Sequence, residues 1–352
     1  MKLLIANGYV IDPSQAVNTG RDLLIDDGRV VGLLERGEPA PKNVAVLDAT
    51  GLIVAPGFID MHTHLREPGQ TSKETIETGT RAAARGGFTS VCAMPNTKPV
   101  NDERAVTEFI LALAGRKAVV NVYPIGALTK GLLGWEVTDM ADLVAAGAIA
   151  FSDDGRCVQD NRVMRRALET AKSLGALVID HCEDRPLSEG GVIHEGAMSR
   201  RLGLPGIPAA AEDIMVARDI ILAEALETPV HLAHLSTGGA AHLVREAKSR
   251  GVGISAEVTP HHLVLDDRNL EKREPVFKVN PPLRSPEDVR ALIAAVKDGT
   301  VDVFRPYTHH ADFSCMGRHE GSSSVICYIG TEVVKDIRPD RLALLRKCKP
   351  LR

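Results

Sequence analysis

The sequence predicts an α/β protein in which a (β/α)8 TIM-like barrel follows a small N-terminal β module. From residue 52 onward, eight apolar runs of strand length alternate with stretches of helical pattern. Continuous apolar strands are typical of parallel sheets that are covered on both faces. An open doubly wound sheet commonly carries a glycine-rich phosphate loop, but neither GxGxxG nor GxxxxGK[ST] occurs. We therefore expect the barrel.

Residues 1–51 are predicted to form the β module, because they contain short strand-like runs separated by turn residues. Asp27-Gly28 is typical of a hairpin turn between strands at residues 22–25 and 29–33. The edges of such strands are an aggregation liability unless another segment pairs with them.

The barrel is predicted over residues 52–303. Its strands are expected at residues 52–60, 88–95, 118–126, 148–154, 176–182, 229–236, 254–260 and 300–304. Its helices are expected at residues 73–85, 102–115, 161–174, 212–226, 239–249 and 285–296. The longest loop, residues 183–210, follows the fifth strand, so it is expected to lie over the C-terminal face of the barrel, where it could cover a site.

Composition excludes several functions. The net charge is −4 and aromatic residues make up 3%, whereas a nucleic-acid-binding protein is expected to be basic and to offer stacking surfaces. No apolar run is long enough for a membrane span, and the N-terminal run is too short for a signal peptide. The six cysteines form no CxxC pair, which fits reduced thiols. We expect no nucleic-acid or membrane partner and a cytoplasmic location.

Two histidines end the first expected barrel strand. Residues i and i+2 of a strand point to the same face, so His62 and His64 are expected to face the barrel axis together. Two convergent imidazoles suit Zn²⁺ or a similar metal. Taken alone, the pair also fits two structural histidines in a turn.

Further ligand-type residues lie at the ends of the fourth, fifth and sixth expected strands: Asp154, His181 and His234. Each of them alone is commonly structural, and Asp153-Asp154 also fits a turn or an N-cap. Because the C-terminal ends of barrel strands converge on one face, their joint occurrence predicts a metal site.

Arg66, Asn96 and Asn280 follow the first, second and seventh expected strands and are candidate substrate-binding residues. The guanidinium of Arg66 offers a bidentate fork for a carboxylate, and the two asparagines can hydrogen-bond amide or imide groups. The alternatives are a surface salt bridge for Arg66 and Asx turns for the asparagines. His261-His262 is expected to support its loop, and Cys182 is expected to be structural.

Eight motifs add to this prediction. They are DMHTHLREPG (60–69), KETIETGT (73–80), GGFTSVCAMPNTKP (86–99), FSDDG (151–155), HCED (181–184), HLST (234–237), AEVTPHHL (256–263) and FKVNPPLR (277–284). From residue 1 to about residue 303, the chain resembles the bacterial-type dihydroorotases of the amidohydrolase superfamily. Hydantoinases and allantoinases share the HxH pair and the barrel, but HLREPG with MPNT and NPPLR is similar to dihydroorotases in particular.

The resemblance implies reversible hydrolysis of (S)-dihydroorotate to N-carbamoyl-L-aspartate, a step of de novo pyrimidine synthesis, with one or two zinc ions. The implied metal ligands are His62, His64, Asp154, His181 and His234. The first two would bind one ion, the last two a second, and the aspartate would bridge them, because strand four lacks the lysine that hydantoinase-type sites use. The implied substrate-binding residues are His64, Arg66, Asn96 and Asn280.

The chain departs from the family pattern after about residue 303. The family has a catalytic aspartate at the end of strand eight, and the spacing from His234 puts Tyr307 at that position. A tyrosine, with a pKa of about 10, is a poor base at pH 7, so no catalytic base is found there. Residues 304–352 form a divergent tail with nine Lys and Arg against five Asp and Glu. In the family, a longer C-terminal segment completes the β module.

Two explanations of this tail are open: a change of reading frame near codon 304, or a divergent homologue with reduced activity. Besides its small-molecule substrate, the chain could have two partners, a second copy in a homodimer and aspartate transcarbamoylase. Inactive dihydroorotase-like chains are structural partners of the latter enzyme. A zinc-dependent dihydroorotase is the main expectation. Such a structural partner, or a hydantoinase- or allantoinase-type hydrolase, is the alternative.

Overall fold

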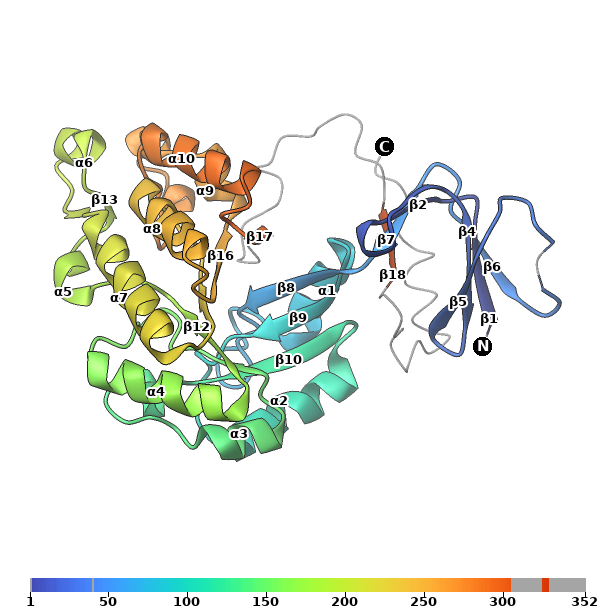
Figure 1. The fold of residues 1–352 in the computed structure, drawn as a ribbon, viewed down its shortest axis with the longest axis horizontal. Helices are drawn as coiled ribbons and strands as arrows, with labels where there is room; N and C mark the ends of the chain where they lie inside the picture. Colours follow the sequence, from blue (N-terminus) through green and yellow to red (C-terminus); the bar gives the residue numbers. More distant parts are fainter. Residues whose placement is uncertain (1, 40, 305–324, 329–352) are drawn as a thin grey trace.

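The computed structural model describes residues 2–39, 41–304 and 325–328. Within them the chain forms a β module at one end of the molecule and a curled α/β sheet at the other (Figure 1). Tyr307 and most of the divergent tail, 304–352, lie outside the described residues.

The β module consists of two four-stranded sheets. The first has the order β5-β4-β1-β6, with bounds Arg29–Leu34, Asp22–Asp26, Lys2–Ala6 and Ala45–Asp48. The second has the order β18-β7-β2-β3, with bounds Val325–Tyr328, Ile53–Pro56, Tyr9–Asp12 and Val17–Gly20. A short 3₁₀ turn, Pro13–Gln15, joins β2 to β3. Buried apolar side chains of both sheets, including Leu23 and Val54, form one core.

The predicted hairpin is confirmed. Strands β4 and β5 pair antiparallel, and Asp27 and Gly28 between them have φ angles of 45° and 78°. Left-handed conformations at both positions match the twist of a tight hairpin. Strand β18, which belongs to the divergent tail, pairs parallel with β7. This part of the tail therefore covers an edge of the module.

The apolar run at residues 52–60, expected as one barrel strand, is divided between the two sheets. Strand β7 pairs with β2 and β18 in the module, whereas β8 (Phe58–Thr63) pairs with β9 (Phe88–Ala93) in the barrel. Gly57 separates them, and a Cβ atom at this position would collide with the side chain of Thr89. The first barrel strand therefore begins at Phe58 rather than at residue 52.

The barrel sheet contains eight parallel strands in the order β17-β16-β15-β12-β11-β10-β9-β8. The remaining bounds are β10 Asn121–Gly126, β11 Ala150–Phe151, β12 Leu177–Asp180, β15 Val230–Leu232, β16 Ile254–Val258 and β17 Val303–Phe304. All eight predicted strands are present, and the sheet curls as in a (β/α)8 fold (Figure 1). In the part of the chain that the structure describes, no ladder joins β17 to β8.

Helices cover the outer face of this sheet (Figure 1). The six predicted helices are α1 (Ile76–Arg85), α2 (Arg104–Lys117), α4 (Asn161–Leu174), α7 (Ala210–Leu226), α8 (Gly238–Ser249) and α10 (Pro286–Lys297). The sequence pattern misses α3 (Met140–Ala146), which has only seven residues. The largest buried apolar cluster, including Phe151 and Leu232, lies between the sheet and these helices.

The connections contain shorter elements. Residues 183–210, expected as one loop, form α5 (Arg185–Ser188), β13 (Ile193–His194), α6 (Ala197–Leu202) and β14 (Gly206–Ile207). The others are η2 (Lys130–Leu132), α9 (Pro260–Val264), η3 (Asp267–Lys272) and η4 (Pro275–Phe277). No helix among the described residues has the length and apolar character needed to cross a membrane.

Candidate metal centre

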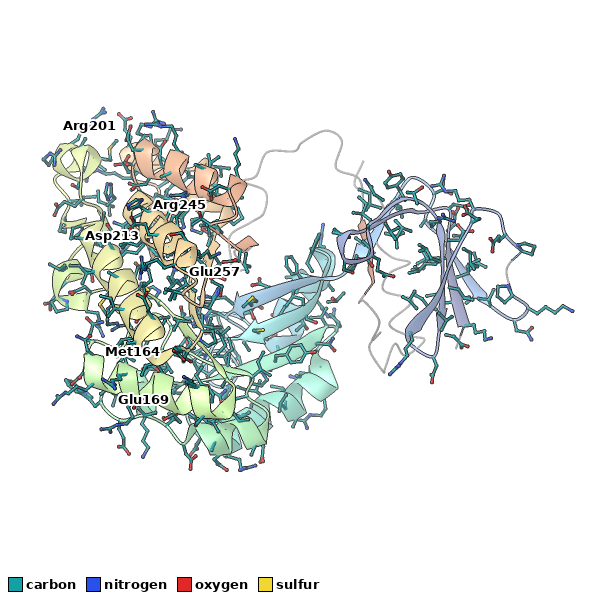
Figure 2. All side chains as sticks on the ribbon, in the orientation of Figure 1. Met164, Glu169, Arg201, Asp213, Arg245 and Glu257 are labelled. Atoms are coloured by element: carbon teal, nitrogen blue, oxygen red, sulfur yellow. The ribbon has the colours of Figure 1, made fainter. Side chains whose placement is uncertain are left out.

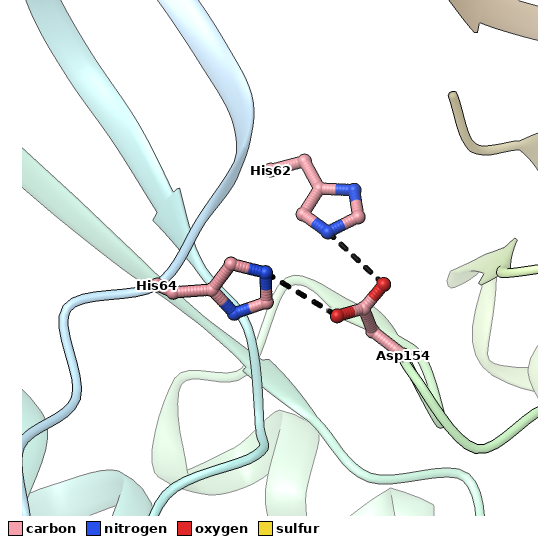
Figure 3. Close-up of side chains that lie close together, drawn as sticks. All are labelled: His62, His64 and Asp154. Atoms are coloured by element: carbon pink, nitrogen blue, oxygen red, sulfur yellow. Dashed lines mark ion pairs between the residues drawn. The ribbon is translucent and has the colours of Figure 1, made fainter. Parts of the chain in front are cut away.

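The end of β8 brings His62 and His64 to the same place. His62 is only 1% exposed, and its backbone N–H donates to Oδ1 of Asp60 at 3.1 Å. The Nε2 atoms of His62 and His64 lie 3.1 and 3.4 Å from the two carboxylate oxygens of Asp154 (Figure 3). The structure therefore brings together the two imidazoles and the aspartate that the sequence singles out.

Asp154 follows β11, a strand of only two residues, and its carboxylate contacts the imidazoles of His62 and His64. Its neighbour Asp153 turns away and accepts hydrogen bonds from the backbone amide (3.0 Å) and the hydroxyl of Thr129. Burial opposes ionisation of Asp154, but the surrounding imidazoles, His62 first, hold the pKa of this carboxyl well below its usual range. Asp154 is therefore a carboxylate at neutral pH.

His181 and His234 join the group from the ends of β12 and β15. Nδ1 of His181 lies 2.9 Å from Nε2 of His234, and these two atoms lie 3.7 and 3.6 Å from Oδ1 of Asp154. Both imidazoles are buried. Burial lowers the pKa of His234 to about 4, so its imidazole is neutral at pH 7, which is the form that binds metals.

These side chains form two groups of metal-donor type. One contains His62, His64 and Asp154, and the other contains Asp154, His181 and His234. Within each group the donor atoms lie within 4.8 Å of one another. Imidazole nitrogens and carboxylate oxygens are the ligands found in hydrolytic metal sites. The donor set therefore fits a metal ion, and Asp154 belongs to both groups.

Asn96, on the loop after β9, lies beside the first group. Its Oδ1 lies 3.0 Å from Nδ1 of His64, and its Nδ2 donates to Oδ2 of Asp154 at 3.3 Å. Nη1 of Arg66 donates to the same Oδ1 of Asn96 at 3.5 Å. The backbone of Arg66 has a left-handed φ of 62°, so the chain turns directly after the HxH pair. The structure thus places a guanidinium and an amide next to the metal-type donors.

Asn280 contacts the second group. Its Nδ2 lies 3.4 Å from Nε2 of His181 and donates to Oε2 of Glu183 at 3.1 Å. Glu183 also lies 2.9 Å from Nε2 of His181. Although burial opposes it, the hydrogen bond from His181 lowers the pKa of Glu183 to about 2. The candidate substrate-binding residues therefore reach the donors at two places, one beside His64 and one beside His181.

Two acidic residues at the centre, Glu183 and Glu257, are missed by reasoning from the sequence. Oε1 of Glu257 lies 3.2 Å from Nδ1 of His62, and the residue is fully buried on β16. One signal could have identified it: a single carboxylate inside the apolar run ISAEVTP is expected to need a buried partner. Glu183 carries no comparable signal, because an acid at the start of a polar loop is ordinary.

Two other sequence features support the scaffold. His262 is buried and its Nε2 donates to the carbonyl oxygen of Pro281 at 3.1 Å, which ties its loop to the one that carries Asn280. Cys182 is buried, and its Sγ donates to Asp219 at 3.5 Å. The guanidinium of Arg218 lies 2.8 Å from the same carboxylate. A third group of donor-type residues, Asp180, Cys182 and Asp219, is therefore already paired with a cationic side chain.

A curled sheet of eight parallel strands with histidines and an aspartate at its C-terminal strand ends is the architecture of the amidohydrolase superfamily. The family described as dihydro-orotase-like matches residues 51–239 of the chain. A dihydroorotase of Pelotomaculum thermopropionicum is 55% identical over 311 residues, covering 88% of this chain and 72% of that protein. The chain belongs to the dihydroorotase family.

A second relative agrees with this assignment, and a solved structure agrees with the fold. A dihydroorotase of Syntrophus aciditrophicus is 49% identical over 311 residues, again covering 88% of this chain and 72% of that protein. Among solved structures, the L-hydantoinase (dihydropyrimidinase) from Arthrobacter aurescens superposes with a TM-score of 0.75. That match covers 94% of this chain and 74% of the hydantoinase at 19% identity, so it supports the fold alone.

Proposed function

We propose that the chain is a zinc-dependent hydrolase that converts (S)-dihydroorotate and water reversibly into N-carbamoyl-L-aspartate, in the cytoplasmic synthesis of pyrimidines. The observation that carries this proposal is the position of Arg66, whose guanidinium contacts Asn96 beside the metal-type donors. Dihydroorotate carries a carboxylate next to its cyclic amide, and a guanidinium binds a carboxylate through two parallel hydrogen bonds. The family membership supports the same substrate.

The proposed roles divide the residues into two sets. The zinc ligands are His62, His64, Asp154, His181 and His234. A zinc ion bound there would lower the pKa of a water molecule toward neutrality and polarise the scissile carbonyl. Arg66, Asn96 and Asn280, together with His64, orient the substrate so that its cyclic amide lies against these donors.

Position 307 favours a second candidate function. The family resemblance expects an aspartate there as the proton acceptor, and the chain has Tyr307. A tyrosine hydroxyl is neutral at pH 7. It therefore accepts a proton far less readily than the carboxylate of an aspartate does. The second candidate is a homologue of reduced activity that assembles with aspartate transcarbamoylase, either as single chains or as a homodimer.

The deciding experiment measures turnover and assembly on one preparation. The zinc-loaded chain is mixed with (S)-dihydroorotate, and formation of N-carbamoyl-L-aspartate is followed. Size-exclusion chromatography with and without aspartate transcarbamoylase follows assembly. Turnover that disappears on chelation and returns with zinc supports the first function. A metal-loaded chain without turnover that co-elutes with aspartate transcarbamoylase supports the second.

A further inference from the structure

Glu257 is a fully buried carboxylate on β16, in the barrel part of the molecule (Figure 2). Side chains alternate along β16: Ala256 and Val258 belong to the core that the helices cover, so Ser255 and Glu257 take the opposite face. A buried carboxylate is strongly destabilising unless hydrogen-bond donors surround it. The groups that contact Glu257 should therefore explain why a carboxylate is buried at this position.

Its contacts join the two groups of metal-type donors. Oε1 lies 3.2 Å from Nδ1 of His62 and also accepts a hydrogen bond from the backbone N–H of His234 at 3.2 Å. Oε2 lies 3.5 Å from Nε2 of His231, a buried histidine earlier on β15. One carboxylate thus contacts a histidine of the first group through its ring and a histidine of the second group through its backbone.

The contact with His62 selects a tautomer. A neutral imidazole has one N–H donor and one nitrogen with a free lone pair. A carboxylate beside Nδ1 favours the proton on Nδ1, which leaves the lone pair on Nε2. Nε2 lies 3.1 Å from Asp154, on the side of the metal-type donors, where a bound metal ion would take the place of a proton shared with that carboxylate. Carboxylates that orient metal-binding histidines in this way also increase the basicity of the ligand.

The contact with His234 restrains a strained backbone. His234 has a left-handed φ of 34°, a conformation that residues other than glycine adopt only when their surroundings hold them there. Glu257 holds this turn twice, because its side chain accepts from the N–H of His234 and its backbone carbonyl accepts from the N–H of Leu235 at 2.8 Å. The imidazole of His234 is thereby directed toward His181 and Asp154.

We propose that Glu257 is a positioning residue that prepares His62 and His234 together for metal binding. It fixes the ring tautomer of His62 and the backbone turn at His234, and it does so without contacting substrate. This inference rests on the metal site of the proposed function. It concerns metal affinity, however, and can be tested without any substrate.

The test uses Glu257→Gln, which keeps the shape of the side chain but removes its charge. Zinc affinity is measured by competition with a chromophoric chelator, and the ligand geometry by the visible absorption spectrum of the cobalt-substituted protein. We expect zinc to bind about 10- to 100-fold more weakly, with an altered cobalt spectrum. Glu246→Gln, the same chemical change at an exposed glutamate of α8, should leave both readouts unchanged. Wild-type affinity and spectrum in Glu257→Gln would overturn the proposal.

If Glu257→Gln does not fold, a second measurement on the unmodified chain tests whether Glu257 positions the ring of His62. The ring ¹⁵N chemical shifts of His62 in the zinc-loaded protein report which nitrogen binds the metal and which carries the proton. We expect zinc on Nε2 and the proton on Nδ1, beside Glu257, and the reverse arrangement would refute the role of Glu257. Failure of the proposed function looks different: wild-type protein would bind zinc, Glu257→Gln would bind it more weakly, and neither would hydrolyse dihydroorotate.

Discussion

Nε2 of His62 lies 3.1 Å from Oδ1 of Asp154, although the two residues come from the first and fourth strands of the barrel sheet. The second oxygen of the same carboxylate lies 3.4 Å from His64 and accepts a hydrogen bond from Asn96. One side chain therefore connects three strand ends and takes part in both groups of metal-type donors. Its removal should affect the whole centre.

Asp154→Asn should reduce bound zinc to less than about half of the wild-type content, because an amide is a much poorer zinc ligand than a carboxylate. Zinc per chain after dialysis, measured by elemental mass spectrometry, checks this. Asp153→Asn is the matched control, since its side chain faces Thr129 instead of the imidazoles. Equal zinc contents in the two variants would contradict the assignment of Asp154.

Arg66→Ala should lower kcat/KM for dihydroorotate roughly 10- to 100-fold, because a charge-assisted hydrogen bond to the substrate carboxylate is lost. Hydrolysis of an uncharged hydantoin should change much less. The ratio of the two rates, measured for wild type and variant, also separates a dihydroorotase from a hydantoinase-type enzyme. Lys98→Ala, an exposed cation on the neighbouring loop, should leave the ratio unchanged.

Tyr307→Asp should raise kcat for dihydroorotate by roughly 100-fold or more, because a positioned general base contributes on that order. Zinc content should stay the same, since the change concerns proton transfer. Tyr307→Phe serves as the control and should match the wild-type chain. If Tyr307→Phe abolishes turnover, the tyrosine hydroxyl itself takes part in the reaction.

A buried ion pair should contribute strongly to stability. Arg284 and Glu212 are 2% and 3% exposed and lie 3.6 Å apart, and Arg284 also donates to the hydroxyl of Ser236 and the carbonyl of Ile207. Arg284→Met leaves the Glu212 carboxylate buried without its cation. We expect the free energy of unfolding to fall by about 3–5 kcal/mol, measured by urea denaturation.

The control for this experiment is an exposed pair. Arg250 and Glu224 lie 3.3 Å apart with about half of each side chain exposed. Arg250→Met should change the free energy of unfolding by less than about 1 kcal/mol. Similar losses in Arg284→Met and Arg250→Met would refute a special role for the buried pair.

Alkaline pH should destabilise the fold through Cys92. Burial, with help from the charges of Asp60 and Glu257, raises the pKa of its thiol from 9.0 to about 12. The stabilisation from this group is therefore complete below pH 9 and is lost as pH rises toward 12. One such group changes the free energy of unfolding by up to about 1.4 kcal/mol per pH unit. Cys92→Ala should show a shallower decline between pH 9 and 12, and an unchanged slope would count against this assignment.

The sequence predicts the barrel well because its strands are covered on both faces and therefore read as continuous apolar runs. It does not predict where β7 ends and β8 begins, since both strands lie in one apolar run and differ only in the sheet that they join. The HxH spacing and the polar strand ends correctly predict that His62, His64 and Asp154 meet. Glu257 is not predicted, because its role depends on contacts between β16, β8 and β15 that no local pattern encodes.

The division between β7 and β8 has a consequence for how the length of this chain can vary among its natural relatives. Only Gly57 lies between the two strands, and successive side chains of a strand take opposite faces. An insertion or deletion of a single residue between Gly57 and His62 would turn both imidazoles toward the helices, and one between His62 and His64 would separate the pair. The connection between β5 and β6 is under no such constraint. Insertions and deletions should therefore collect in that connection, while the segment from Gly57 to His64 should keep its length wherever both histidines are kept.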